Sequence, residues 1–107
     1  MVQAEEANDN TREVQARKVQ DYDHCEKTGD FFLTPPNKHE GGARRLSFIC
    51  PCGCGELAGI RVRDDGHNID GAWGWDKNED QPTCTPSIRI DGEHWHGHLT
   101  AGVFVPC

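Results

Sequence analysis

Three of the six cysteines in this 107-residue chain stand at alternate positions of the stretch I-C-P-C-G-C-G-E, at Cys50, Cys52 and Cys54. Cysteines two apart in an extended chain have Cα atoms about 6.5 to 7 Å apart, at the far limit of what a disulfide tolerates. A redox pair usually has two residues between its thiols, whereas each neighbouring pair here has one. A zinc ion accepts this spacing if the chain turns, because its sulfur ligands lie only about 3.8 Å apart.

The residues between the cysteines favour such a turn. Pro51 fixes one φ angle, while Gly53 and Gly55 permit positive φ. We therefore predict a zinc knuckle, with a merely buried cluster of thiols as the alternative. A metal would also stabilise a short chain whose hydrophobic content of 35% is too low for a large core.

The fourth ligand of the predicted zinc ion lies outside this run. Cys107 is the first choice, because it ends a predicted hairpin strand and a second-strand cysteine commonly completes a zinc knuckle. His94 or His96 follows, and Cys84 comes after them. Cys25 lies in a polar segment and is expected to be a free thiol.

The charge of the chain argues against nucleic acid as a partner. Eleven basic and eighteen acidic residues give a net charge of −7, without the clustered lysines and arginines that bind phosphate. No apolar run approaches the length of a membrane span, and no secretory leader is evident. We expect a cytoplasmic protein, in the host cytoplasm if phage-encoded, that acts on a protein substrate or partner and not on a membrane.

The pattern from residue 45 onward predicts β-strands. Residues 45–63 read as a hairpin with the cysteine turn at its tip, and residues 72–75 and 87–90 as two short strands. Residues 76–83 read as a polar loop between them. A second hairpin covers residues 94–105, across a turn at Thr100-Ala101-Gly102.

The N-terminal part is less regular. Residues 1–13 are polar and are expected to form a mobile arm, residues 14–28 suit a short strand or a weak helix, and residues 31–33 suit a strand. The expected fold class is mostly β, with a small α+β fold as the alternative. Residues 14–107 would form a single compact antiparallel domain stabilised by the zinc knuckle.

A second concentration of polar chemistry occurs in E-H-W-H-G-H-L, residues 93–99. If this stretch is extended, His94, His96 and His98 share one face of a strand and the residues between them share the other. Alternating imidazoles can bind a metal; the alternative is that they are surface residues of a half-exposed strand.

The order of several short motifs resembles a family of small bacterial and phage proteins. The motifs are C-P-C-G-C-G, then P-S-I at residues 86–88, W-H-G-H-L-T-A-G-V at residues 95–103 and a terminal cysteine, and the resemblance covers roughly residues 45–107. Some members occur in bacterial ubiquitin-like conjugation operons, where a peptidase role has been proposed for them. The resemblance implies a zinc-bound β fold with Ser87 as candidate nucleophile and His96 as candidate base.

This pairing is chemically reasonable. A serine hydroxyl is a weak nucleophile until an imidazole takes its proton, and two adjacent strands can bring Ser87 and His96 together. An orienting carboxylate would complete a triad, with Asp70, Asp76 and Asp91 as candidates. The alternative for Ser87 is a residue at the start of a strand that makes a local hydrogen bond.

Three functional hypotheses result. The first is a zinc-stabilised Ser/His acyl hydrolase, a peptidase for the C-terminal tail of a ubiquitin-like protein. The second is a non-catalytic interaction or inhibitor module that acts through its acidic surface. The third is a metallohydrolase in which His94, His96 and His98 hold a catalytic zinc ion.

Overall fold

Almost all regular structure in the described part of this chain is β-strand. The computed structural model describes residues 12–36, 38, 43–63, 72–90 and 94–107. The strands are β1 (Val14–Gln15), β2 (Arg17–Lys18), β3 (Asp30–Leu33), β4 (Arg44–Ile49), β5 (Leu57–Arg63), β6 (Trp73–Trp75), β7 (Cys84–Ile90), β8 (Trp95–Thr100) and β9 (Val103–Pro106). One 3₁₀ turn, η1 (Tyr22–His24), separates β2 from β3. Within these ranges no helix is long and apolar enough to cross a membrane.

The nine strands form one mixed sheet in the order β1-β9-β8-β7-β6-β5-β4-β3-β2. Only the pairs β2/β3 and β5/β6 are parallel, and the other six pairs are antiparallel. The predicted, mostly antiparallel β fold is therefore confirmed. Most of the predicted N-terminal arm, residues 1–11, lies outside the described residues.

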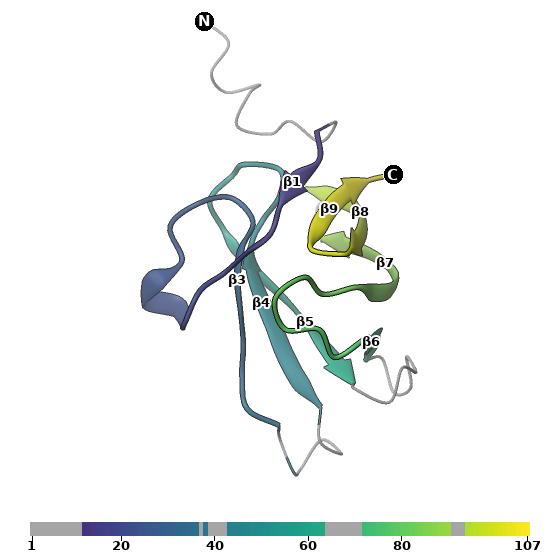
Figure 1. Cartoon of the computed structure of the whole chain (residues 1–107). Helices are drawn as coiled ribbons and strands as arrows, with labels where there is room; N and C mark the ends of the chain where they lie inside the picture. The colour runs from purple at the N-terminus through teal and green to yellow at the C-terminus, as the bar shows by residue number, and fades with distance from the viewer. Residues whose placement is uncertain (1–11, 37, 39–42, 64–71, 91–93) are drawn as a thin grey trace, which may run out of the picture.

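The two ends of the sheet are made by neighbouring pieces of chain. β1 pairs with β9 and β2 pairs with β3, with Ala16 as the one residue between them. The amide of Ala16 donates to the carbonyl of Gly102 at 2.9 Å, and that of Arg17 donates to Gly29 at 3.1 Å. This extended segment joins the last hairpin to the first, as its path from β9 toward β3 in Figure 1 shows.

A buried carboxylate anchors this segment, residues 14–18, which we call the closing segment. Asp30 is 1% exposed, and it accepts hydrogen bonds from Arg17 Nε at 2.9 Å and Nη2 at 2.7 Å. The amides of Glu26 and Lys27 each donate to it at 2.9 Å. The hydrogen bond from Arg17, with these amides and against the effect of burial, holds the pKa of Asp30 well below its usual range.

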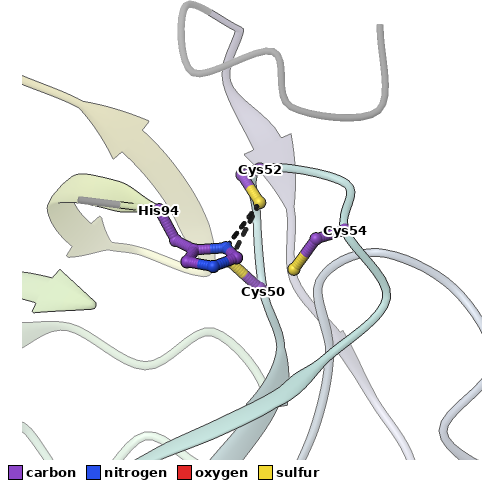
Figure 2. Close-up of side chains that lie close together, drawn as sticks. All are labelled: Cys50, Cys52, Cys54 and His94. Carbon is purple, nitrogen blue, oxygen red and sulfur yellow. Dashed lines mark hydrogen bonds between the residues drawn. The ribbon is translucent and has the colours of Figure 1, made fainter. Parts of the chain in front are cut away.

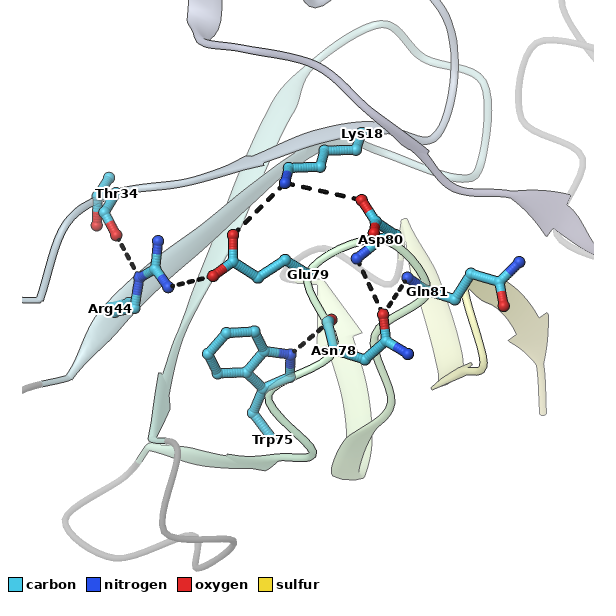
Figure 3. A network of polar contacts seen from close by, with 8 residues as sticks. All are labelled: Lys18, Thr34, Arg44, Trp75, Asn78, Glu79, Asp80 and Gln81. Atoms are coloured by element: carbon cyan, nitrogen blue, oxygen red, sulfur yellow. Dashed lines mark hydrogen bonds and ion pairs between the residues drawn. The ribbon is translucent and has the colours of Figure 1, made fainter.

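A second polar network links the loop before β7 to strands β4 and β2 (Figure 3). Glu79 accepts from Arg44 Nη1 at 3.3 Å and pairs with Lys18 Nζ at 3.4 Å. Arg44 Nε also donates to the carbonyl of Thr34 at 2.7 Å, and its guanidinium lies 5.6 Å from the centre of the Trp75 ring. The exposed ion pairs contribute little individually, but they orient the predicted polar loop over residues 76–83.

The core lies on one face of the strands, and β8 shows this most clearly. Its exposure alternates, with Trp95, Gly97 and Leu99 buried and the histidines between them exposed. The Trp95 and Phe104 rings meet edge-on with centroids 5.7 Å apart. A Cβ on Gly97 would overlap the Val105 carbonyl oxygen and lie 2.6 Å from the Trp95 ring, so only glycine fits under this indole.

The predicted hairpins are present. β4 and β5 pair from Arg44↔Val62 to Ile49↔Leu57, with the cysteine turn at the tip. β8 and β9 are joined through Ala101 and Gly102, which have positive φ angles of 49° and 78° and suit a tight two-residue turn.

One strand boundary was predicted wrongly. β7 begins at Cys84 and not at Ser87, so it includes Pro86. Proline is tolerated there because the pairing with β8 is irregular between Cys84 and Ile88, where a missing N–H donor breaks no regular ladder. Ser87 therefore lies inside a strand and not at its start.

Candidate functional site

The tip of the β4–β5 hairpin turns back on itself through the cysteine run. The amide of Cys50 donates to the carbonyl of Glu56 at 2.8 Å, and that of Gly53 donates to the carbonyl of Cys50 at 3.1 Å. Gly53 and Gly55 have φ angles of 94° and 85°, in the region that favours glycine. The turn is thus closed by backbone bonds and permitted by the two glycines, as the sequence indicates.

This turn brings three thiols and one imidazole together. Each of Cys50, Cys52, Cys54 and His94 offers a ligand atom, and these four atoms all lie within 4.8 Å of one another. Figure 2 shows the His94 ring directed at the thiols from the segment that leads into β8. The Cys50 and Cys52 sulfurs are 3.3 Å apart, and Cys52 Sγ is 3.6 Å from His94 Nδ1. We call this group the Cys₃His knuckle.

The chemistry of the knuckle suits a metal ion. Cys50 and Cys52 are each 1% exposed, and burial is the main cause that raises the pKa of both thiols. A bound cation reverses this effect, because its charge stabilises the thiolate forms. Three sulfurs and one imidazole match a borderline or soft transition metal and not a hard cation such as magnesium. The group could therefore hold such an ion.

The structure does not bring Cys107 into the knuckle. Among the described residues, His94 completes the group, and it takes the place for which Cys107 was the first choice. The amide of Cys107 donates to the carbonyl of His96 at 3.0 Å, so β9 carries the Cys107 side chain alongside the exposed histidines of β8. Cys84 is a core residue whose pKa burial raises to about 12, and Cys25 is half-buried. All six cysteines are described, and none forms a disulfide.

Ser87 and His96 lie within hydrogen-bond reach, with 3.1 Å between Oγ and Nε2. The pairing of β7 with β8 explains this contact. Arg89 is directly opposite His96, and Ser87 is two residues before Arg89 on the same face. Ser87 is therefore the diagonal neighbour of His96, a position from which long side chains can meet.

Both backbones of this pair are held in place. Trp73 Nε1, from β6, donates to the carbonyl of Ser87 at 3.2 Å. On the other side, Cys107 donates to the carbonyl of His96 as described above. Three neighbouring strands and the residue after β9 thus hold the backbones that carry the hydroxyl and the imidazole.

The candidates for an orienting carboxylate divide into two groups. Asp76 Oδ1 accepts from the amides of Asn78 at 3.0 Å and Thr83 at 3.2 Å, so it is used within its own loop. Asp70 and Asp91 lie outside the described residues. The described part of the structure therefore gives a serine–histidine pair.

Sequence reasoning missed the place of Cys107. Its Sγ lies 3.8 Å from His96 Nε2 and 3.9 Å from His98 Nδ1, next to the serine–histidine pair. The signal was available, because a two-residue turn at Ala101-Gly102 sets Thr100 opposite Val103, and the same register places His96 opposite the residue after Pro106.

Comparison with known families identifies one match. Residues 18–107 match the family described as "Bacterial ubiquitination-like system serine protease (BubE)". The match confirms the resemblance based on short motifs and extends it toward the N-terminus to β2. Comparisons with curated proteins and with solved structures gave no match.

Proposed function

The chain belongs to this family of serine proteases of bacterial ubiquitination-like systems, and from that premise we propose that Ser87 and His96 are its nucleophile and general base. The observation that carries the proposal is the 3.1 Å separation of Ser87 Oγ and His96 Nε2. A nucleophile and its base must lie within such a distance before any other requirement matters.

The expected reaction is acyl transfer through a covalent intermediate. Ser87 Oγ attacks the scissile carbonyl while His96 Nε2 takes the hydroxyl proton, and the protonated imidazole then gives that proton to the leaving amine. Water, activated by the same nitrogen, attacks the acyl-enzyme and releases Ser87. These reaction steps require the tautomer of His96 that carries its proton on Nδ1.

We assign the substrate as the C-terminal tail of a ubiquitin-like protein. The family description supports a protein substrate in a ubiquitination-like system. The geometry is compatible with an extended tail, because Ser87 is half-buried and His96 is exposed on the outer face of β7 and β8. A peptide can therefore reach the hydroxyl without any opening of the core.

We assign zinc to the Cys₃His knuckle, in a structural role. Zinc accepts three thiolates and one imidazole, and a site with four protein ligands leaves no open position for substrate. His94 is the residue directly before β8, two residues before His96. The ion would cross-link the β4–β5 turn to the start of the strand that carries the base.

The direct test measures nucleophilicity and cleavage together. Wild-type protein should cleave a ubiquitin-like protein extended at its C-terminus and should be labelled by a fluorophosphonate at one serine. Ser87→Ala should abolish both, with a loss of about 10³-fold or more in rate, while zinc content and melting temperature stay near the wild-type values. Thr85→Ala is the matched control, since it removes a hydroxyl two residues away on β7.

Two outcomes would contradict the assignment. Equal cleavage by Ser87→Ala and wild type, stopped by chelators without unfolding, would favour the metallohydrolase. Absence of both labelling and cleavage, with tight binding of the ubiquitin-like protein, would favour a non-catalytic interaction module.

A further inference from the structure

Two exposed side chains of residue types that bind metals, Cys107 and His98, lie beside the proposed catalytic pair and take no part in its chemistry as described so far. Cys107 Sγ lies between two imidazoles, 3.8 Å from His96 Nε2 and 3.9 Å from His98 Nδ1. The same His96 nitrogen contacts Ser87 Oγ at 3.1 Å. The thiol and the hydroxyl thus approach the same ring nitrogen, His96 Nε2.

The two distances from Cys107 Sγ to the imidazole nitrogens are close to those between ligand atoms of one coordinated zinc ion. With zinc bonds of about 2.3 Å to sulfur and 2.05 Å to nitrogen, tetrahedral geometry places the two ligand atoms about 3.6 Å apart. In the knuckle, Cys52 Sγ and His94 Nδ1 are also 3.6 Å apart. The two distances at Cys107 exceed this value by only a few tenths of an ångström.

We propose that a zinc ion, additional to the one assigned to the knuckle, binds Cys107, His96 and His98 and withdraws His96 Nε2 from Ser87. The Cys107 thiol releases its proton to solvent on binding, and the three side chains supply one thiolate and two neutral imidazoles. A solvent molecule completes the coordination. One lone pair on Nε2 cannot hold the metal and accept the serine proton at the same time.

Binding at this second site should be weaker than at the knuckle. The knuckle has four ligand atoms that already converge within 4.8 Å and two buried thiols. The three side chains of the second site are exposed, and no such convergence is found for them among the described residues. One imidazole ring must rotate to close the second site, which suits a reversible ion and not a permanent one.

The consequence for activity rests on the proposed function. If His96 is the general base, occupation of the second site inhibits hydrolysis at zinc concentrations that leave the knuckle unchanged. If it is not, the ion still binds, and its binding is measured without any substrate.

The experiment uses the full chain with the knuckle loaded with zinc. Zn²⁺ is titrated in and bound metal is measured by equilibrium dialysis, while the imidazole ¹⁵N spectrum reports on His96 Nε2. We expect one additional equivalent and a shift of the Nε2 resonance. Cys107→Ser and His98→Gln should each weaken this equivalent by about tenfold or more, since loss of a group that only orients a ligand already costs that much.

The controls are the imidazole of His24, the last residue of η1, and the thiol of Cys25, the residue after it. Cys25→Ser and His24→Gln remove the same chemical groups elsewhere and should leave the second equivalent unchanged. Cleavage is then followed in each variant relative to its own zinc-free rate. The zinc concentration for half-inhibition should rise by the same factor as the dissociation constant.

The outcomes separate this proposal from the proposed function. A second equivalent that is absent, or that survives both Cys107→Ser and His98→Gln, overturns the site. Activation by the second equivalent overturns the inhibitory role and favours a metallohydrolase. If wild type neither cleaves nor reacts with a fluorophosphonate, the proposed function fails, and the stoichiometry and Nε2 shift still decide whether the ion binds.

Discussion

The Cys₃His knuckle and the outer face of β8 use similar residue types but differ in burial. In the knuckle, two thiols are 1% exposed and four ligand atoms converge within 4.8 Å. On the outer face, His96, His98 and Cys107 are exposed, and His96 Nε2 lies 3.1 Å from the Ser87 hydroxyl. The buried group is suited to permanent binding, whereas the exposed group is accessible to substrate and to solvent ions.

The difference arises over a few residues of one strand. Trp95 is 1% exposed and directs its indole into the core, while His94 and His96 flank it. His94 lies before the strand begins, so its ring is free of the strand alternation and reaches the thiols of the β4–β5 turn. His96 lies within the strand, so the alternation points it outward. The start of β8 therefore lies between His94, to which we assign a structural role, and His96, to which we assign a chemical one.

The largest expected effect comes from removing the zinc ion that we assign to the knuckle. Cys52→Ser, or a chelator applied to the wild type, should unfold the β domain. The apparent binding free energy of a structural zinc ion, about 10 to 16 kcal/mol, equals or exceeds the whole stability of a typical domain. Circular-dichroism melts with parallel zinc analysis measure this, with Ser87→Ala as the control that keeps zinc and fold. Coincident melts of apo and holo protein would remove the structural role.

The comparison is sharpest between the two histidines that flank Trp95. His94→Gln should lower zinc content and the free energy of unfolding by several kcal/mol, because the buried thiols lose part of their metal. His96→Gln should keep zinc and melting temperature and should lower the cleavage rate by about 10³-fold or more. Metal analysis, melting and cleavage on both variants provide the test. Loss of zinc in His96→Gln would make His96 a knuckle ligand and would remove the base from the proposed reaction.

The sequence carried the local features of both regions. The alternating cysteines with Gly53 and Gly55 predicted a turn at the hairpin tip. The alternation of E-H-W-H-G-H-L correctly predicted that His96 and His98 share a face, but it wrongly placed His94 with them, because His94 precedes β8 and lies with the cysteines. These features depend on neighbours within a few residues, where spacing and φ preferences act directly. They could therefore be read without knowing how the strands assemble.

One of the features that were missed depends on pairing between distant strands, and the others depend on short or unusual segments. The choice of His94 over Cys107 depends on which side of β8 meets the cysteine turn, and no local pattern encodes that. The sequence left residues 14–28 open between a short strand and a weak helix, because two-residue strands such as β1 and β2 show no periodicity. The early start of β7 was hidden by Pro86, which normally argues against a strand.

The contact between Arg17 and Asp30 involves no metal, so it tests how much of the stability lies outside the knuckle. Asp30→Asn should cost roughly 2 to 4 kcal/mol, because it removes a buried carboxylate bonded to Arg17 and to two amides. Since the folded pKa of Asp30 is depressed, its contribution is complete above the ordinary aspartate pKa of about 4 and declines as the pH falls below it.

The difference in unfolding free energy between wild type and Asp30→Asn isolates this contribution, because the metal contributes to both proteins. Urea titrations at several pH values should show the difference shrinking from pH 5 toward pH 3. A difference that does not change over this range would mean that the Arg17–Asp30 pair does not control the closing segment.

The smallest expected effect tests the shape of the knuckle turn itself. A Cβ at Gly55 would meet no atom within 4 Å, so any cost of Gly55→Ala comes from its φ of 85° and not from a clash. That strain should lower the free energy of unfolding by about 1 kcal/mol. Gly55→Asn should recover part of the loss, because asparagine adopts positive φ more readily than alanine. Denaturant melts of the zinc-loaded variants measure both. Equal stability of the alanine variant and wild type would show that the turn can relax without this backbone conformation. The knuckle would then be defined by its ligands alone, whereas the serine–histidine pair depends on the positions of its strands.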